Sequence, residues 1–265
     1  MHVNSFKISR FYDPSLWALL VLILTAIPVH FWDRQIFMFL NGSHTPLTDI
    51  FWLSFTTLGD GLLICMILGC FLLINPRIAI AGLAVFLLAS IVVNLVKYMI
   101  PSARPLELMQ IVHVTGPALR WGSFPSGHTA AGLSASLVLM SYAHGYSMKV
   151  MVSLIAVLIG LSRIFVGAHF PSDVLWGAIC AITTYYIVRI TIWSKIETIT
   201  PDRPDFSVKL FRSAFFLQCG LSLFGLLVYS IRFSEYPPAG VAISVGVIAF
   251  VCIKLFEIAP LSGND

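Results

Sequence analysis

The sequence predicts an all-α protein: a polytopic membrane helix bundle in which a six-helix core is followed by two further transmembrane helices. Composition is the first reason. Of the 265 residues, 58% are hydrophobic and 11% are charged, whereas about a quarter of the residues in an ordinary soluble domain are charged. The second reason is that apolar runs of helix length recur, separated by segments with proline, glycine and charged residues. The formal net charge of +4 is small and no basic cluster is present, so we expect the lipid bilayer, and not nucleic acid, as a partner.

The first predicted helix covers residues 16–32. Lys7 and Arg10 precede it, as in a signal peptide. No small-residue cleavage site follows, so we expect an uncleaved transmembrane helix. The next segment, 33–49, is polar and contains glycine, which predicts a loop.

The second and third helices follow this loop. A Gly-Asp-Gly sequence at 59–61 interrupts the apolar residues 50–58. Residues 50–58 are therefore either an interfacial segment or an early start of the second helix, which ends near Ile74. The third helix spans 78–100 and ends before Pro101, because proline cannot continue a helix.

Three more core helices follow the loop at 102–124. Ser126 is a favourable N-cap for the first of them, and the three are expected at 126–142, 150–166 and 172–193. From Ser194 the chain becomes polar and charged, with two prolines, and two more apolar runs follow at 213–231 and 241–256. We therefore divide the chain into a core at 1–194, a linker at 195–212 and two additional transmembrane helices within 213–265.

Eight helices place both termini on one side of the membrane, and the positions of lysine and arginine predict which side. One side receives ten of these residues and the other receives six. The ten are Lys7, Arg10, Arg77, Lys149, Arg189, Lys195, Arg203, Lys209, Arg212 and Lys254. The six are Arg34, Lys97, Arg104, Arg120, Arg163 and Arg232. Three of the six belong to the polar segments described next, and without them the ratio is ten to three. We expect cytoplasmic termini and a cytoplasmic linker.

Three segments carry polar residues where apolar runs end: 97–105, 125–128 and 162–173. In the third, His169 and Asp173 are four residues apart, and Pro171 suits the first turn of a helix. A carboxylate just below the His169 ring accepts one imidazole N–H, fixes the tautomer and leaves the other nitrogen free to attack. All three segments belong to one face of the predicted bundle, so we expect them to converge on a phosphate.

Five residues of these segments are suited to binding that phosphate. Lys97, Arg104 and Arg163 supply the positive charge that a phosphoryl group requires in its transition state. Ser126 and Gly127 begin a helix, where free backbone N–H groups bind anions. No metal or other cofactor is needed, because the three cations take its place.

Three further residues are suited to the chemistry itself. His169 is the predicted nucleophile and forms a phosphohistidine. His128 is the predicted acid that protonates the leaving oxygen and the base that then activates water. Asp173 orients His169 and stabilises its positive charge.

The three segments together resemble the three-part signature of the type-2 phosphatidic acid phosphatases. That superfamily also includes lipid phosphate phosphatases, vanadium haloperoxidases and bacterial acid phosphatases. The first part is Lys97, six residues, Arg104 and Pro105; the second is Pro-Ser-Gly-His at 125–128; the third is Ser162-Arg163, five residues, His169, three residues and Asp173. The resemblance covers 97–173 by motif and the six-helix core by pattern. It implies the same division of labour and a bacterial membrane protein.

Each site residue also has a simpler explanation when taken alone. A lysine such as Lys97 at a helix end commonly extends its charge to the interface. Ser126 serves as an ordinary helix cap, and a carboxylate in a first turn, such as Asp173, complements the helix dipole. These explanations leave the joint spacing of the three segments unexplained, so we favour the catalytic interpretation.

A site at the bilayer surface suits a lipid whose phosphate lies at headgroup depth. We expect a metal-independent phosphatase of the cell inner (cytoplasmic) membrane that hydrolyses a lipid phosphomonoester or diphosphate, with its site facing the periplasm or exterior. Phosphatidylglycerol phosphate, phosphatidic acid, undecaprenyl diphosphate and the lipid A 1-phosphate all remain open as substrates. The oligomeric state and the role of the last two helices also remain open.

Other functions fit parts of the pattern. A lipid phosphotransferase keeps the same intermediate but passes the phosphoryl group to another lipid. A haloperoxidase requires vanadate in the phosphate site, and an eight-helix bundle fits that soluble chemistry poorly. A transporter or a non-catalytic scaffold belongs to a different class. Every charge of the site lies at one end of its helix, which argues against the midplane site of a transporter.

Overall fold

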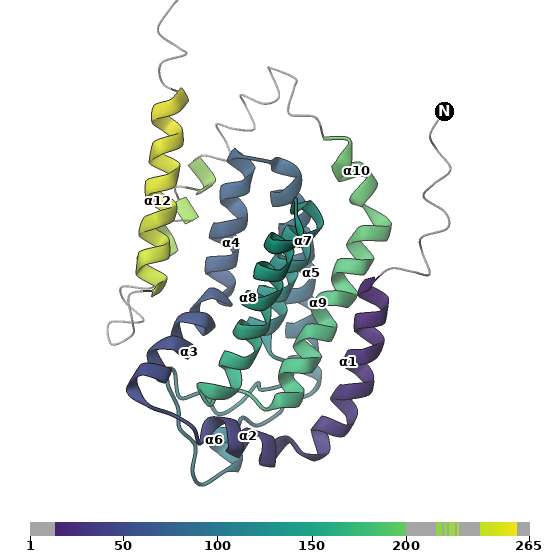
Figure 1. Ribbon diagram of the computed structural model, residues 1–265, viewed down its shortest axis with the longest axis vertical. Helices are drawn as coiled ribbons and strands as arrows, with labels where there is room; N and C mark the ends of the chain where they lie inside the picture. Colours follow the sequence, from purple (N-terminus) through teal and green to yellow (C-terminus); the bar gives the residue numbers. More distant parts are fainter. Residues whose placement is uncertain are drawn as a thin grey trace, which may run out of the picture.

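The chain folds into a bundle of helices in the computed structural model (Figure 1), which describes residues 14–199, 216–218, 220–221, 223–225, 227 and 239–258. The elements are α1 (Pro14–Phe31), α2 (Asp33–Asn41), α3 (Pro46–Leu58), α4 (Gly61–Cys70), η2 (Phe71–Leu73), α5 (Pro76–Met99), α6 (Pro105–Leu108), α7 (Gly127–Tyr142), α8 (Tyr146–Phe165), α9 (Pro171–Thr191), α10 (Trp193–Glu197) and α12 (Ala239–Ile258). Within the described residues there is no strand, only an isolated bridge between Ala103 and Trp121. The predicted all-α fold is confirmed.

Several of these helices are suited to crossing a membrane. Among the described residues, α5, α8 and α9 are each long and apolar enough to do so alone. Two pairs qualify together but are bent, α1 with α2 by 86° and α3 with the α4–η2 segment by 60°. If each bent pair is one span, the described residues contain up to five spans, which agrees with a polytopic membrane protein.

The prediction of a loop at 33–49 is wrong, because α2 and the start of α3 occupy most of this segment. The buried residues of α2 are Asp33, Phe37 and Asn41, which lie four residues apart, so they form one inward face of an amphipathic helix. Thr45 caps α3, since its Oγ1 accepts from the Thr48 N–H at 3.2 Å. The segment is polar because it lies across the end of the bundle. Since two of the three residues on its buried face are polar, the sequence shows no clear apolar repeat of helical period.

The Gly-Asp-Gly interruption at 59–61 marks the bend between α3 and α4. Asp60 Oδ1 accepts from the N–H groups of Leu62 at 2.9 Å and Leu63 at 3.4 Å, and so caps α4. Gly59 allows the corner to approach the core. A Cβ added there would lie 2.6 Å from Ile159 Cγ2 and 3.2 Å from His128 Cβ. Residues 50–58 belong to α3, which begins at Pro46 and is bent by 60° from the α4–η2 segment; this geometry fits both alternatives that the sequence left open.

Helix α7 lies at the centre of the bundle and packs against α4, α5, α8 and α9. Its buried residues are mostly small: Thr129, Ala130, Ala131, Gly132, Ser134, Ala135, Ser136 and Val138. Small side chains let neighbouring helices approach closely, which is typical of helix packing in membranes. A Cβ on Gly132 would lie 2.9 Å from Ile159 Cδ1. The close packing fixes α7, and with it the polar residues at its first turn.

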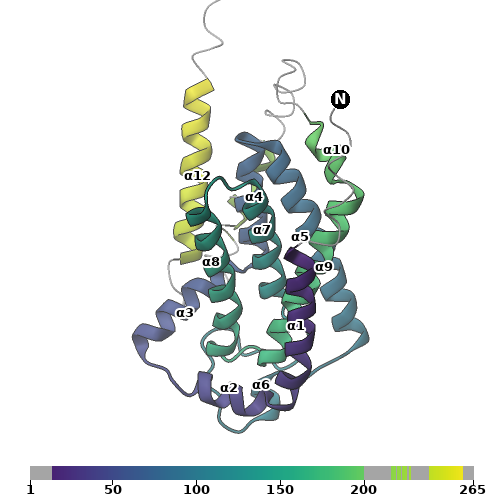
Figure 2. The same cartoon turned by 45° about the vertical axis from the view of Figure 1, so that its right-hand side comes forward.

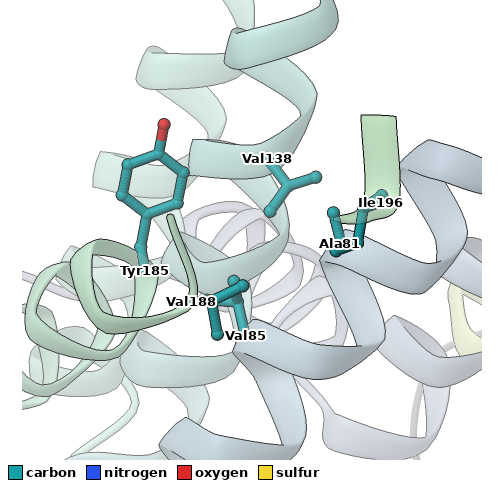
Figure 3. Close-up of a cluster of buried hydrophobic side chains, with 6 residues drawn as sticks. All are labelled: Ala81, Val85, Val138, Tyr185, Val188 and Ile196. Atoms are coloured by element: carbon teal, nitrogen blue, oxygen red, sulfur yellow. The ribbon is translucent and has the colours of Figure 1, made fainter. Parts of the chain in front are cut away.

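An apolar cluster closes the end of the bundle at which α10 lies, opposite α2 and α6 (Figures 1 and 2). Its buried members are Ala81, Val85, Val138, Tyr185, Val188 and Ile196 (Figure 3). They come from α5, α7, α9 and α10 and are each at most 5% exposed. This end is therefore a packed core, while the polar segments lie at the other end.

The C-terminal region packs outside this core, where α12 contacts α3 and α4. Figure 2 shows α12 on the side of the bundle away from α9. Gln218 Nε2 donates to Met66 O at 2.7 Å and attaches the preceding segment to α4. The start of the predicted linker, Lys195–Glu197, belongs to α10. The rest of the linker from residue 200 and both termini lie outside the described residues.

Candidate active site

The three polar segments meet at the end of the bundle that carries α2 and α6 (Figures 1 and 2). Lys97 lies in the last turn of α5, residues 126–128 begin α7, Arg163 lies in the last turn of α8, and Asp173 lies in the first turn of α9. The predicted convergence of these segments is observed, although 76 positions separate Lys97 from Asp173 in the sequence.

The turn between α8 and α9 places His169. The Arg163 carbonyl accepts from the N–H groups of Ala168 at 3.0 Å and His169 at 3.1 Å. Gly167 has φ +75°, and a Cβ there would lie 2.3 Å from His113 O, so glycine is needed for both its conformation and its space. Asp173 Oδ2 accepts from Phe170 N–H at 2.9 Å, which fixes the carboxylate beside the turn.

His169 is 2% exposed and Asp173 is 5% exposed. The His169 Nδ1 lies 3.6 Å from Asp173 Oδ2, the pairing that the four-residue spacing predicts. A third buried group lies between them. Ser123 Oγ donates to Asp173 Oδ2 at 2.5 Å and lies 3.5 Å from His169 Nδ1.

Arg104 approaches the other nitrogen of the same ring, with Nη1 3.5 Å from His169 Nε2. Its guanidinium also donates to Trp121 O at 3.0 Å, Ala168 O at 3.1 Å and Gly122 O at 3.3 Å. Burial lowers the pKa of Arg104 below its ordinary value, and Asp173 opposes this. An arginine pKa is so high that the group stays charged. Arg104 is therefore a fixed cation beside the predicted nucleophile.

Lys97 and Arg163 provide the other two charges. Lys97 Nζ donates to Gly122 O, the carbonyl that Arg104 also contacts. Arg163 is 8% exposed, and its Nη1 donates to Thr56 Oγ1. Its Nε is buried without a hydrogen-bond partner among the described residues. A buried N–H of this kind requires an acceptor, which a bound anion would supply.

The start of α7 contributes backbone donors. Ser126 Oγ accepts from Thr129 Oγ1 at 2.9 Å and from Thr129 N–H at 3.5 Å, so Ser126 caps the helix. Its own N–H donates to Asp173 O at 2.9 Å and is not free, contrary to the expectation for this group. No described residue accepts from the N–H groups of Gly127 or His128, which lie in the turn that an α-helix leaves unpaired.

His128 follows directly in the same turn and is half-buried. Its ring has electrostatic interactions with Arg163 and His169, but it makes no hydrogen bond to any residue that the structure describes. The ring is therefore available to a bound group. Gly59, from the corner between α3 and α4, packs against its backbone.

Burial lowers the pKa of His169 well below its ordinary value, and the charges of Arg104, Arg163 and Lys97 lower it further. A backbone hydrogen bond with Ser123 acts in the opposite direction. The net shift keeps the ring neutral near neutral pH, the state in which a ring nitrogen has a lone pair to donate. Within the described part of the chain, no group of three or more His, Cys, Asp or Glu side chains is placed to hold a metal ion.

Sequence reasoning did not identify Ser123, Thr56 or the contacts of Asp33. Asp33 Oδ1 accepts from Ser172 N–H at 2.7 Å, and Asp33 Oδ2 accepts from Ser172 Oγ. This joins the α1–α2 corner to the start of α9. A cavity of about 680 Å³ lies beside this junction and reaches Asp173. The partners of these residues are 50, 107 and 139 positions away, so no local pattern indicated them.

Comparisons with known proteins agree with this arrangement. Residues 78–197 match the PAP2 superfamily model, a range that contains every predicted site residue. The chain is 24% identical over 217 residues to the lipid A 4'-phosphatase of Bacteroides thetaiotaomicron, covering 75% of this chain and 95% of that protein.

Two solved structures are similar to it. Aquifex aeolicus LpxE has 32% sequence identity and a TM-score of 0.55, covering 58% of this chain and 93% of that chain. The first transmembrane PAP2 type phosphatidylglycerolphosphate phosphatase from Bacillus subtilis has the same fold, with 20% identity and a TM-score of 0.51, covering 71% of this chain and 98% of that chain. The predicted family resemblance is thus confirmed, and the chain belongs to the PAP2 superfamily.

Proposed function

We propose that this chain is an integral membrane lipid phosphatase that hydrolyses a lipid phosphomonoester or diphosphate through a phosphohistidine on His169. The observation that carries the proposal is the environment of His169. Its Nε2 lies 3.5 Å from the fixed cation of Arg104, and its Nδ1 lies 3.6 Å from the Asp173 carboxylate. One nitrogen therefore lies where an anion binds, and the other lies where a carboxylate stabilises positive charge.

In the first step, His169 Nε2 attacks phosphorus and the bond from phosphorus to the leaving oxygen breaks. His128 donates a proton to that oxygen as it leaves. Charge on the equatorial oxygens is stabilised by Lys97, Arg104 and Arg163. The Gly127 N–H, which has no acceptor among the described residues, adds a backbone donor.

In the second step, water attacks the phosphohistidine. His128, now neutral, takes a proton from the water, the bond between phosphorus and Nε2 breaks, and inorganic phosphate leaves. His169 recovers its lone pair. Asp173 stabilises the cationic ring during the lifetime of the intermediate. The protein's own cations perform the electrostatic work, so the proposed mechanism requires no metal ion.

A lipid is the proposed substrate because the site residues lie at the ends of apolar helices, where a headgroup phosphate reaches them while the tails stay in the bilayer. One relative is a lipid A 4'-phosphatase, which supports a substrate of this class. We assign catalysis to the predicted core at 1–194, which α10 extends to Glu197; the remaining linker, 198–212, and the two helices within 213–265 lie outside it.

The charge distribution supports an extracytoplasmic site and cytoplasmic termini. Single cysteines introduced at the two ends of the bundle test this orientation. Leu119→Cys, near the site, should react with a membrane-impermeant maleimide in intact cells, since Leu119 is 47% exposed. Tyr146→Cys, at the opposite end and 84% exposed, should react only after permeabilisation. The reverse pattern would overturn the orientation.

The activity itself is tested with purified protein and a panel of lipids. Phosphatidylglycerol phosphate, phosphatidic acid, undecaprenyl diphosphate and lipid A are incubated separately, and released phosphate and labelled lipid products are measured. Release with at least one lipid, lost in His169→Ala and retained in His144→Ala, supports the proposal; His144 is exposed and lies beyond the end of α7. Transfer of label to a second lipid without phosphate release would identify a phosphotransferase. Activity in His169→Ala equal to wild type would overturn the proposal.

A further inference from the structure

Ser123 is the one buried hydroxyl that contacts both members of the His169–Asp173 pair within the described residues. It is 0% exposed. Its Oγ lies 2.5 Å from Asp173 Oδ2 and 3.5 Å from His169 Nδ1. The three-part signature does not include it, because the second part begins at Pro125.

His169 Nδ1 lies 3.6 Å from Asp173 Oδ2, just beyond hydrogen-bond distance, and 3.5 Å from Ser123 Oγ, at the outer limit of that distance. Asp173 Oδ2 is already occupied by two donors, Ser123 Oγ–H and Phe170 N–H. A serine hydroxyl has one proton to donate and two lone pairs to accept with. Its proton goes to the carboxylate, so a lone pair remains for the imidazole Nδ1–H.

We infer that Ser123 is a positioning residue that connects Asp173 to His169, accepting from His169 Nδ1–H while it donates to the carboxylate. This role rests on the proposed function, in which His169 Nε2 is the nucleophile. An acceptor at Nδ1 keeps the proton on that nitrogen, so the lone pair lies on Nε2, the nitrogen beside Arg104. When Nε2 bonds to phosphorus the ring becomes cationic, and the Ser123–Asp173 pair stabilises that charge.

The backbone around Ser123 holds its side chain in this place. Gly122 N–H and Ser123 N–H both donate to Ser102 O, at 2.9 Å and 3.2 Å, and Phe124 N–H donates to Ser102 Oγ at 2.7 Å. Lys97 and Arg104 both donate to the carbonyl of Gly122, the residue before Ser123. Two of the proposed phosphate-binding cations thus also fix the loop that carries the hydroxyl.

The charged groups that face His169 are Asp173, Arg104, Arg163 and Lys97. Three of the four are cations and oppose a positive ring, which Ser123 supports through its backbone as well as through its hydroxyl. Asp173 is the one anion among them, and within the described residues Ser123 Oγ is the group that lies between its carboxylate and the ring. Removing Ser123 Oγ should therefore have the same consequence as removing the Asp173 charge.

The test compares Ser123→Ala, Asp173→Asn and the double variant in the full-length protein, with p-nitrophenyl phosphate as substrate. Ser134→Ala is the matched control, because Ser134 is a fully buried serine of α7 whose Oγ has no partner among the described residues. We expect Ser123→Ala to lower kcat by about 10- to 100-fold, the effect of one hydrogen bond to a charged group. The inhibition constant of inorganic phosphate should change by less than about twofold, because the phosphate-binding groups remain.

The double variant separates this role from a structural one. If Ser123 acts through Asp173, the double variant should be no slower than Asp173→Asn alone, because residues that act as a unit are not additive. If Ser123→Ala fails to fold, Ser123→Cys takes its place, since a thiol fills the site but is a weak donor. A folded Ser123 variant with wild-type kcat, or losses that multiply in the double variant, would overturn the inference.

Trapping the phosphoenzyme distinguishes this inference from the proposed function. Wild-type protein quenched in alkali after labelling should carry phosphohistidine at His169, and Ser123→Ala should form it more slowly. Absence of the label in active wild-type protein would overturn the proposed function. Formation of the label at the wild-type rate in Ser123→Ala would overturn only the role of Ser123.

Discussion

Arg104 and His169 lie 65 positions apart in the sequence, yet Arg104 Nη1 lies 3.5 Å from His169 Nε2. The guanidinium is held there by three backbone carbonyls, those of Trp121, Gly122 and Ala168. The last of these immediately precedes His169. The cation and the predicted nucleophile are therefore fixed relative to each other before any substrate binds, as electrostatic catalysis requires.

Replacing Arg104 tests this relationship. Arg104→Ala should lower kcat/KM by about 10²–10³-fold, the usual cost of losing one donor to a transition-state oxyanion. Arg104→Lys should recover part of the loss, because lysine keeps the charge but not the planar fork. Arg120→Ala is the control, since Arg120 lies in the same loop but is exposed and pairs with Glu107. Steady-state kinetics on the purified variants measure all three, and an Arg120→Ala loss equal to that of Arg104→Ala would contradict the prediction.

The pH profile should reflect the lowered pKa of His169. His169 must be neutral to attack, so the acid limb of kcat/KM should lie below about 6.5, the ordinary histidine pKa. Arg104→Gln removes a positive charge that disfavours protonation, so it should move this limb to higher pH. The assignment of the acid limb to His169 would be refuted if the midpoint of this limb lay above about pH 6.5 in wild type. A midpoint that moved to lower pH in Arg104→Gln would refute it as well.

The same shift makes stability depend on pH. Below about 6.5 the unfolded chain binds a proton at His169 that the folded chain does not, so the contribution of this group to stability falls as pH decreases from that value. It becomes constant once the pH is below the folded pKa. His169→Gln should flatten this part of the profile. Thermal unfolding in detergent between pH 7 and 5 measures the difference.

His128 should matter in proportion to how poor the leaving group is. The rate of His128→Ala should fall about 10²–10⁴-fold with an alkyl phosphate. The first step should be slowed less with p-nitrophenyl phosphate, because p-nitrophenolate can leave without being protonated. Breakdown of the intermediate still needs a base, so phosphohistidine should accumulate in this variant. Rapid quench and alkali-stable labelling measure both steps. If His128→Ala forms no phosphoenzyme while His169→Ala does, the two roles are reversed.

Activity should persist in a chelator, and vanadate should inhibit, because it adopts the five-coordinate geometry of the transferring phosphoryl group. Arg163→Ala should weaken this inhibition, since its buried Nε lacks a partner among the described residues and would donate to the anion. Dose–response curves with and without EDTA test both statements. Loss of activity in EDTA that one divalent ion restores would exclude the metal-free mechanism.

Gly59 should be required for the position of His128. A Cβ at Gly59 would lie 2.6 Å from Ile159 Cγ2 and 3.1 Å from His128 O, so Gly59→Ala should destabilise the protein by about 1–3 kcal/mol through overpacking and reduce kcat. Gly61→Ala is the matched control, because its Cβ would meet only Phe86, at 3.4 Å, in ordinary contact at the start of α4. Thermal unfolding and kcat are measured together, and equal effects of the two changes would contradict the prediction.

The helical architecture was predictable because an apolar run long enough to cross the bilayer must satisfy its backbone hydrogen bonds within the segment, which an α-helix does. The end of α5 and the starts of α7 and α9 were predictable because their signals are local. Pro101 cannot continue a helix, Ser126 caps one, and Pro171 suits a first turn, whatever residues surround them. The amphipathic helix α2 was missed because its apolar face is narrow, with Phe37 buried between the polar Asp33 and Asn41.

The sequence by itself determined which residue types stand at the end of the bundle that carries the candidate site, since charged side chains are confined to the ends of apolar helices. It also placed Asp173 in the first turn of α9, from which its carboxylate reaches back to the residues just before the helix, His169 among them. Only the tertiary structure decided that Ser123 lies between them, that Arg104 approaches Nε2 rather than Nδ1, and that Thr56 holds Arg163. Each of these contacts joins segments 50 or more positions apart. Their geometry depends on how α5, α7, α8 and α9 pack around small side chains, and no short-range pattern in the sequence encodes that packing.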